Sequence, residues 1–116
     1  MIDRTLAHLS DMLDFVRELR ALVGATALET YHGQRVLNLA VEKLFINLGE
    51  AAQRIPDGRR AAIGDVPWRQ IIGLRNILAH GYEQVDHETL YRTITTELAS
   101  VERALVEHLA RRGGDG

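Results

Sequence analysis

Residues 67–82 read PWRQIIGLRNILAHGY, and this stretch has the features of a complete helix. Pro67 suits the first turn of a helix, where its missing N–H has no partner in any case. Gly81 suits the left-handed residue that follows a helix end. The stretch therefore predicts a helix that begins near Pro67 and ends at about His80, directly before a turn.

The end of this predicted helix carries side chains that can handle a phosphodiester. Arg75 holds a permanent charge on a fork that matches phosphate, and a histidine such as His80 can gain or lose a proton near neutral pH. Asn76 lies one turn before His80 on the same face, so it is placed to orient His80 or to share a ligand with it. Arg75 and His80 differ by about 140° around an ideal helix, but they can converge because Arg75 is long and His80 is terminal. A structural reading stays open, in which both form a basic helix end that complements the helix dipole.

Apolar residues recur in helical steps of three and four on both sides of this stretch. Gly24 fits the end of a first helix, and Pro56-Asp57-Gly58 ends a second with turn chemistry. Asp86 suits the N-cap of a last helix, whose apolar residues continue to Leu109. The expected helices cover about residues 2–23, 33–54 and 67–80, a short piece at 59–66, and the last helix after Asp86. The pattern predicts an all-α fold, an antiparallel bundle of about four to five helices.

Length and composition limit the class of protein. With 116 residues the chain fits one domain, which we place at residues 1–112, followed by a flexible glycine-rich tail at 113–116. Cysteine is absent, which excludes disulfides and thiolate metal sites. The chain opens directly into an amphipathic pattern without a signal peptide, and no apolar run approaches the roughly 20 residues that span a bilayer. We therefore expect a cytoplasmic protein without a membrane partner.

The charge balance limits how the chain can meet nucleic acid. Lys+Arg number 14 against 16 Asp+Glu, for a formal net charge of −2. A protein that coats nucleic acid is strongly basic, so any contact with RNA is expected at a local site.

Cleavage of RNA without a metal needs several catalytic side chains at one site. It needs a base for the 2′-hydroxyl, an acid for the leaving 5′-oxygen and a cation on the phosphorane. One subunit offers a single well-placed histidine, His80, and a single arginine, Arg75. Two subunits paired through this helix would offer two of each, so a catalytic role predicts a two-fold homodimer with the site across its interface.

The run 67–82, followed by Val85-Asp86, closely resembles the HepT-like members of the HEPN superfamily. Their signature is an arginine, four to six residues, a histidine, one residue and a tyrosine, and here Arg75, His80 and Tyr82 fill it. The segment NLGEAAQRI at 47–55 is similar to the family as well. The resemblance implies a HEPN-like helical fold and a homodimeric, metal-independent endoribonuclease without a cofactor, the toxin of a type VII-like toxin–antitoxin pair. It also implies a partner, a minimal nucleotidyltransferase of the MNT type that neutralises the toxin by transferring AMP from ATP to the motif tyrosine.

The family's roles carry over residue by residue. Arg75 would bind and stabilise the phosphate, His80 would act as acid or base, and Asn76 would support them. Tyr82 would accept AMP, which would place a bulky anion two residues from His80 and compete for Arg75 through charge-assisted hydrogen bonds. The sequence departs from relatives at Glu83-Gln84, where an aromatic residue or an aspartate is frequent.

Further candidates carry weaker signals. Glu50 follows Gly49 in the second predicted helix and could support Arg75, although such a residue is more often a solvated or interface carboxylate. Trp68 is expected in the core rather than as a platform for a base. The other histidines show no spacing typical of metal ligands, so no metal site is predicted. They are His8, His32, His87 and His108.

Two other functions stay open from the sequence. One is a catalytically inactive helical module that binds nucleotide, or that serves the nucleotidyltransferase as substrate and scaffold. The other is a purely structural dimerising bundle. Substitution of His80 separates the inactive module from the nuclease. In a nuclease it would abolish cleavage, and under both functions it would leave the complex with the nucleotidyltransferase unchanged.

Overall fold

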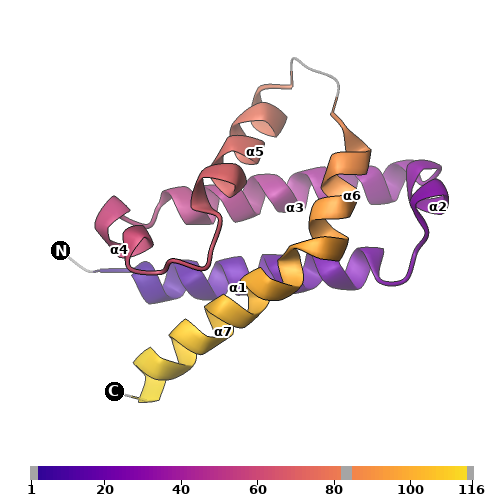
Figure 1. Ribbon diagram of the computed structural model, residues 1–116. Helices are drawn as coiled ribbons and strands as arrows, with labels where there is room; N and C mark the ends of the chain where they lie inside the picture. Colours follow the sequence, from indigo (N-terminus) through magenta and orange to yellow (C-terminus); the bar gives the residue numbers. More distant parts are fainter. Residues whose placement is uncertain (1–2, 82–84, 115–116) are drawn as a thin grey trace.

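The computed structural model describes residues 3–81 and 85–114, and these residues form helices without a strand among them (Figure 1). The helices are α1 (Thr5–Val23), α2 (Leu28–His32), α3 (Arg35–Gln53), α4 (Asp57–Ala61), α5 (Trp68–His80), α6 (His87–Thr96) and α7 (Leu98–Gly114). The all-α prediction is therefore confirmed.

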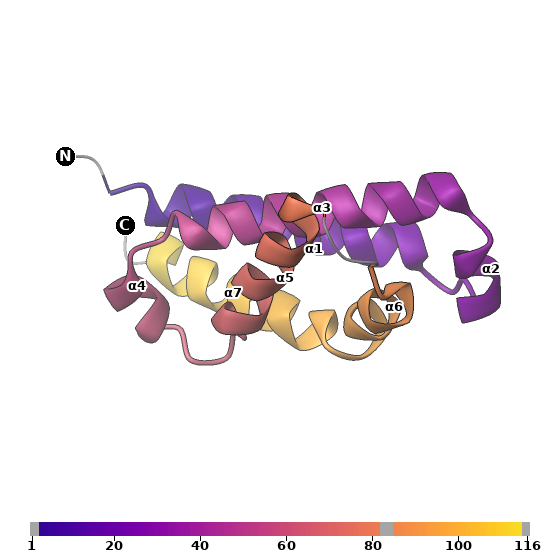
Figure 2. The same cartoon turned by 90° about the horizontal axis from the view of Figure 1, so that it is seen from above.

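The two longest helices, α1 and α3, form the centre of the molecule. They run antiparallel side by side, and α5 packs against α3 while α7 packs against α1 (Figures 1 and 2). Apolar side chains three and four residues apart make the buried face of each helix. On α1 this face contains Leu9, Met12, Val16 and Leu19, and on α3 it contains Val41, Phe45, Leu48 and Ala52.

The glycines expected at helix ends lie where the sequence places them. Gly24 follows α1 with a φ of 50° and Gly81 follows α5 with a φ of 64°, a conformation that costs glycine little. Asp86 caps α6, and its Oδ1 accepts a hydrogen bond from the backbone N–H of Thr89 at 3.2 Å. Trp68 donates from Nε1 to the Ile63 carbonyl at 2.9 Å and packs against the core, in agreement with the expected core position.

The described residues form seven helices, whereas the sequence predicts four to five. One addition is α2, a single turn that is too short to show a hydrophobic period. The short piece expected at 59–66 is also displaced, since α4 occupies Asp57–Ala61.

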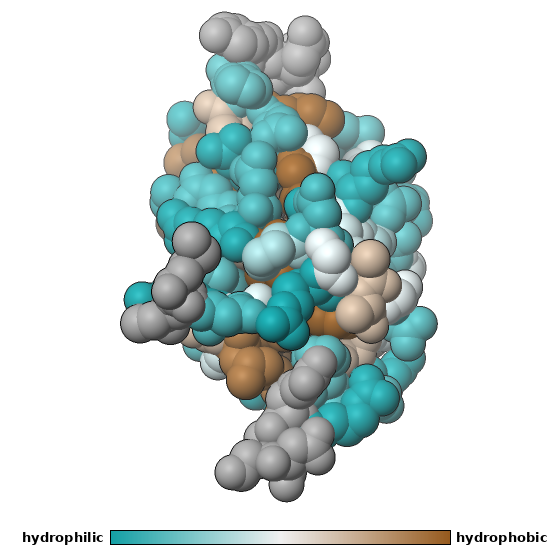
Figure 3. All heavy atoms as spheres, turned by 90° about the vertical axis from the view of Figure 1, so that its left-hand side faces the viewer, coloured by the Kyte–Doolittle hydropathy of each residue, from teal (hydrophilic) through white to brown (hydrophobic). Residues whose placement is uncertain are grey.

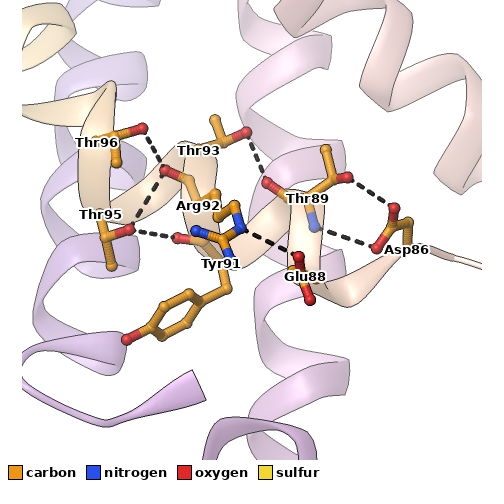
Figure 4. A network of polar contacts seen from close by, with 8 residues as sticks. All are labelled: Asp86, Glu88, Thr89, Tyr91, Arg92, Thr93, Thr95 and Thr96. Atoms are coloured by element: carbon orange, nitrogen blue, oxygen red, sulfur yellow. Dashed lines mark hydrogen bonds and ion pairs between the residues drawn. The ribbon is translucent and has the colours of Figure 1, made fainter. Parts of the chain in front are cut away.

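The second addition comes from a break in the last helix at Glu97, between α6 and α7. Threonine hydroxyls before the break donate to backbone carbonyls one turn back: Thr93 to Thr89 at 2.9 Å, and Thr96 to Arg92 at 2.6 Å (Figure 4). Such bonds compete with the helical ladder and bend helices. The apolar period continues through the break, which is why the sequence predicts one helix there.

The last helix extends to Gly114, into the segment predicted as a tail. The domain bounds of 1–112 and the flexibility of 113–116 stay predictions, and residues 115–116 lie outside the described part. Within the described ranges, no helix combines the length and apolar character needed to cross a membrane.

Candidate functional site

The candidate site begins where α3 and α5 approach most closely. A Cβ atom added to Gly49 would overlap the Cβ of Arg75, and it would lie 2.9 Å from the Arg75 Cγ and 3.1 Å from the Ile71 carbonyl oxygen. Real Cβ atoms do not tolerate such distances, so only glycine fits at this position. The absence of a side chain on α3 therefore creates the space that the stem of Arg75 occupies.

The guanidinium of Arg75 lies at the edge of the core, beside two polar side chains. Its Nη1 donates to the Asn76 Oδ1 at 3.1 Å, and its Nη2 lies 3.8 Å from the Glu50 Oε1. Its Nε is buried and has no hydrogen-bond partner among the described residues. An arginine offers five N–H donors in a fixed fork, so the group is oriented and keeps donors for an anion.

The structure thus brings Arg75, Asn76 and Glu50 together. The amide oxygen of Asn76 accepts from Arg75, whereas the sequence suggested that Asn76 would orient His80 or share a ligand with it. Glu50 approaches Arg75 across the α3–α5 contact, and its supporting role stays a prediction.

His80 is the last residue of α5 and is exposed. The helix is unbroken from Trp68 to His80, so Arg75 and His80 keep the offset of about 140° of an ideal helix. Arg75 faces α3, and His80 ends the helix toward solvent. Tyr82, the predicted acceptor of AMP, lies outside the described residues, as do Glu83 and Gln84.

A stripe on α5 leads along the outer side of the helix to His80. It consists of Gln70, Gly73, Ile77 and His80, spaced by three and four residues. Ile77 is 55 % exposed, and a Cβ added to Gly73 would meet nothing within 4 Å. The open space over Gly73 and the exposed Ile77 leave room for the backbone of another helix to approach this side. We call these four residues the α5 stripe.

A groove of about 420 Å³ lies beside the α5 stripe, between α5 and the pair α6 and α7. Its apolar wall includes Ile71, Leu74 and Ile77 of α5, together with Leu98 and Val101 of α7. The end of the molecule that carries both chain termini is mainly hydrophilic by comparison (Figure 3).

A second polar cluster joins three helices near the start of α6. His87 lies between the Tyr31 hydroxyl, 2.7 Å from its Nδ1, and the Glu42 Oε2, 2.8 Å from its Nε2. Burial, together with the charge of Glu42, raises the pKa of Tyr31 to about 12. We call Tyr31, Glu42 and His87 the His87 cluster.

Sequence reasoning missed this cluster and considered His87 only as a metal ligand. Its members lie 11 and 45 residues apart along the chain, so no local spacing signals them. In the described residues, no three His, Asp or Glu side chains are grouped to hold a metal ion.

The chain is similar to a family of known proteins and to several of its members. A family model described as "Ribonuclease HepT-like" matches residues 12–108, a span that includes all of α3, α5 and α6. "Putative RNase TTE0752" of Caldanaerobacter subterraneus is 28% identical over 106 residues, covering 91% of this chain and 92% of that protein. "Putative RNase MJ1380" of Methanocaldococcus jannaschii is 25% identical over 97 residues, covering 84% and 89%. "Probable ribonuclease HepT" of Thermococcus cleftensis is 23% identical over 95 residues, covering 82% and 86%. No solved structure matches the chain significantly.

Proposed function

Since the chain belongs to the ribonuclease HepT-like family, we propose that it is an endoribonuclease toxin whose catalytic groups are Arg75 and His80. The observation that carries the proposal is the setting of Arg75. Its guanidinium is oriented by Asn76 and Glu50, while the side chain stays 27 % exposed and its Nη atoms keep N–H donors beyond the one that bonds Asn76. One rigid helix therefore holds a cation with donors to spare and ends at an exposed histidine.

The proposed reaction needs no metal. One His80 takes the proton of the RNA 2′-hydroxyl, and the 2′-oxygen attacks the adjacent phosphorus. Arg75 donates to the phosphorane oxygens and stabilises their charge. The bond from phosphorus to the 5′-oxygen breaks, and a second His80 gives its proton to that oxygen. The products are a 2′,3′-cyclic phosphate and a free 5′-hydroxyl.

This reaction requires two copies of His80, so we propose that the active form is a homodimer paired through the α5 stripe. Gly73 leaves room for a second helix to approach, and Ile77 supplies an exposed apolar side chain one turn before His80. Pairing through a two-fold axis at this stripe would bring both helix ends to one cleft.

Control by a minimal nucleotidyltransferase follows from the same family resemblance. The enzyme would transfer AMP from ATP to the phenol oxygen of Tyr82, with pyrophosphate as the leaving group. The new phosphate would lie two residues from His80 in sequence and would compete with RNA for the donors of Arg75. We propose this pair as a type VII-like toxin–antitoxin system that works in the cytoplasm.

One observation favours the second candidate, a catalytically inactive partner of the nucleotidyltransferase. The carboxylate of Glu50 lies 3.8 Å from Arg75 and offsets part of the charge that would bind RNA. In an inactive module this interaction would serve only to hold α3 against α5.

RNA cleavage by the purified, unmodified protein in excess EDTA tests the proposal. We expect cleavage to fall by about a thousandfold in Arg75→Ala and in His80→Ala. Arg69→Ala is the matched control, because it removes an exposed arginine from the same helix. An inactive wild type across several RNA classes, with an intact complex with the nucleotidyltransferase, would favour the inactive module. Equal activity in all variants would identify a contaminating nuclease.

A further inference from the structure

One face of α3 carries a cation on either side of the contact with Arg75. Lys43, Glu50 and Arg54 lie within about 40° of one another around an ideal helix, and the two cations are exposed. Glu50 is the residue that approaches Arg75. Lys43 lies about 10 Å before Glu50 along the helix axis, and Arg54 lies about 6 Å after it. We call Lys43, Glu50 and Arg54 the α3 outer face.

The carboxylates of α3 have partners within the molecule, whereas the cations of the α3 outer face have none. Glu42 lies 2.8 Å from the Nε2 of His87, and Glu50 lies 3.8 Å from Arg75. Over residues 3–81 and 85–114, no carboxylate is within ion-pair distance of Lys43 or Arg54. Both cations are therefore available to an anion from solution.

The spacing of these charges suits the backbone of a single-stranded nucleic acid. Such a strand carries one negative charge at each nucleotide, and proteins bind it through cations that follow the backbone. Lys43 and Arg54 lie about 17 Å apart along α3, and Arg75 meets the helix between them at Glu50. A strand with one phosphate at Arg75 would bring further phosphates toward Lys43 on one side and toward Arg54 on the other.

We propose that the α3 outer face is an RNA-binding surface, in which Lys43 and Arg54 bind backbone phosphates that flank the one held by Arg75. The ligand is then a single strand several nucleotides long, held at this face by its backbone and without selection of bases. The α5 stripe belongs to another helix, so the proposed pairing of two copies leaves the α3 outer face open. Cleavage of the bound strand rests on the proposed function, whereas its binding is measured separately.

Binding of a non-cleavable RNA tests this surface without reference to activity. The probe is a fluorescent RNA decanucleotide with a 2′-O-methyl group on every ribose, which removes the attacking hydroxyl. We expect Lys43→Ala and Arg54→Ala each to raise the Kd about fivefold. Each should also reduce the slope of log Kd against log salt by about 0.7, the loss of one contact to a single strand. Arg54→Lys keeps the charge and should stay within about twofold of wild type.

Arg103→Ala is the matched control for these variants. Arg103 is an exposed arginine of α7 and, like Lys43 and Arg54, has no ion-pair partner in the described part of the chain. However, α7 packs against α1 and α6, away from the contact between α3 and α5 (Figure 1). The variant removes the same charge from the molecule, so a Kd within about twofold of wild type would separate a local contact from an effect of net charge.

Substrates of two lengths test the same surface during the reaction. A dinucleoside monophosphate contains the scissile phosphate alone, whereas a decanucleotide also contains the flanking ones. The preference for the longer substrate, measured as the ratio of the two kcat/KM values, should fall about fivefold in Lys43→Ala and in Arg54→Ala. The fall should come from KM rather than kcat, because these contacts bind the substrate and the transition state alike.

The outcomes separate this proposal from the proposed function. An unchanged Kd and salt slope in folded Lys43→Ala and Arg54→Ala overturn the proposal, and so does an equal loss of affinity in Arg103→Ala. Variants that bind RNA normally but lose the complex with the nucleotidyltransferase would show that this face binds protein, and the proposal fails. A wild type that binds no RNA overturns it as well. If the wild type binds the probe but cleaves no RNA, the proposed function alone has failed.

Discussion

Arg75 lies against α3 because Gly49 has no side chain. The predicted motif identifies Arg75, but it contains no information on the space around its stem, and that space comes from a residue 26 positions earlier. Glycine normally weakens the interior of a helix, so its presence inside the last turns of α3 is explained by the close approach of α5.

We expect Gly49→Ala to reduce the free energy of unfolding by about 1–3 kcal/mol, because the new Cβ displaces Arg75 and α5. RNA cleavage should fall further than stability explains, since the guanidinium moves with its stem. Chemical denaturation and cleavage assays measure the two effects. Gly58→Ala is the control: an added Cβ there meets nothing within 4 Å, and the variant should be neutral or slightly more stable. Equal stability of both alanine variants would contradict the proposed close contact.

At the level of single residues, the sequence predicts which residues begin and end a helix better than it predicts which side chains bond to one another. The helix end at Gly81 and the cap at Asp86 follow from local backbone chemistry, and both are confirmed. The bond from Arg75 to Asn76 and the His87 cluster depend on side-chain orientation and on distant segments. Periodicity and motif spacing contain neither kind of information.

Among the helices, two short connections determine how the long ones are arranged. The single turn α2 is held by Tyr31, its buried residue, and the break at Glu97 redirects α7 along α1. The sequence predicts the long helices well because each repeats an apolar face over many residues. It misses α2 and the break because each is decided within a few residues by tertiary contacts and threonine hydroxyls.

The burial of Tyr31 predicts an alkaline limit to the stability of this arrangement. The pKa of Tyr31 is raised from 10.0 to about 12, so its stabilising contribution is complete below pH 10 and is lost as the pH rises toward 12. The loss should be on the order of 2 kcal/mol. Unfolding of the wild type and of Tyr31→Phe, compared at pH 9 and at pH 11.5, tests this. A similar loss in both proteins would place the alkaline sensitivity elsewhere.

The ion pairs between α1 and α7 should lose their stabilising effect at acidic pH. Arg20 lies 2.6 Å and Arg17 3.3 Å from the carboxylate of Glu102, and hydrogen bonding to Arg20 lowers the pKa of Glu102 below 4.5. Above that pH, Glu102→Gln should be less stable than wild type by about 0.5–1 kcal/mol, a value set by the partial exposure of the ion pair. The difference should disappear as the pH falls through the lowered pKa.

Thermal unfolding from pH 7 to pH 3 measures this effect. Glu107→Gln changes an exposed glutamate of the same helix and provides the comparison. A Glu102→Gln deficit that persists at pH 3 would show that packing, rather than charge, ties α7 to α1.

At the scale of the whole molecule, the exposed apolar residues differ in what surrounds them. Ile77 lies on the α5 stripe and lines the groove next to α6 and α7, and the stripe ends at His80. Val36 is more exposed, at 82 %, but it lies at the start of α3, outside the candidate site. The proposed pairing therefore assigns a role to Ile77 and none to Val36.

Ile77→Lys should yield a folded monomer, because a two-fold interface would bring the two new charges together. Since Ile77 is exposed, the stability of the single chain should change by no more than about 0.5 kcal/mol. RNA cleavage should fall at least a hundredfold if each site needs two copies of His80. Light scattering and cleavage assays measure both effects. Val36→Lys is the matched control and should keep the mass and activity of the wild type.

Monomeric wild-type protein that cleaves RNA at full rate would contradict the shared site. A dimer that persists in Ile77→Lys would move the interface away from the α5 stripe. In either case the roles of Arg75 and His80 are tested separately by their own alanine variants.

The start of α1 and the end of α7 lie at the same end of the molecule as α4 (Figures 1 and 2). Asp3, Arg59 and His108 line one cavity of about 290 Å³ there, and Gly114 follows His108 by six helical residues, a rise of about 9 Å. A short linker could therefore join the two ends, and new ends could be opened at the turn around Gly24. Such a circular permutant would keep α3, α5 and α6 in one uninterrupted segment. The order of the helices along the gene is therefore separable from their arrangement in space.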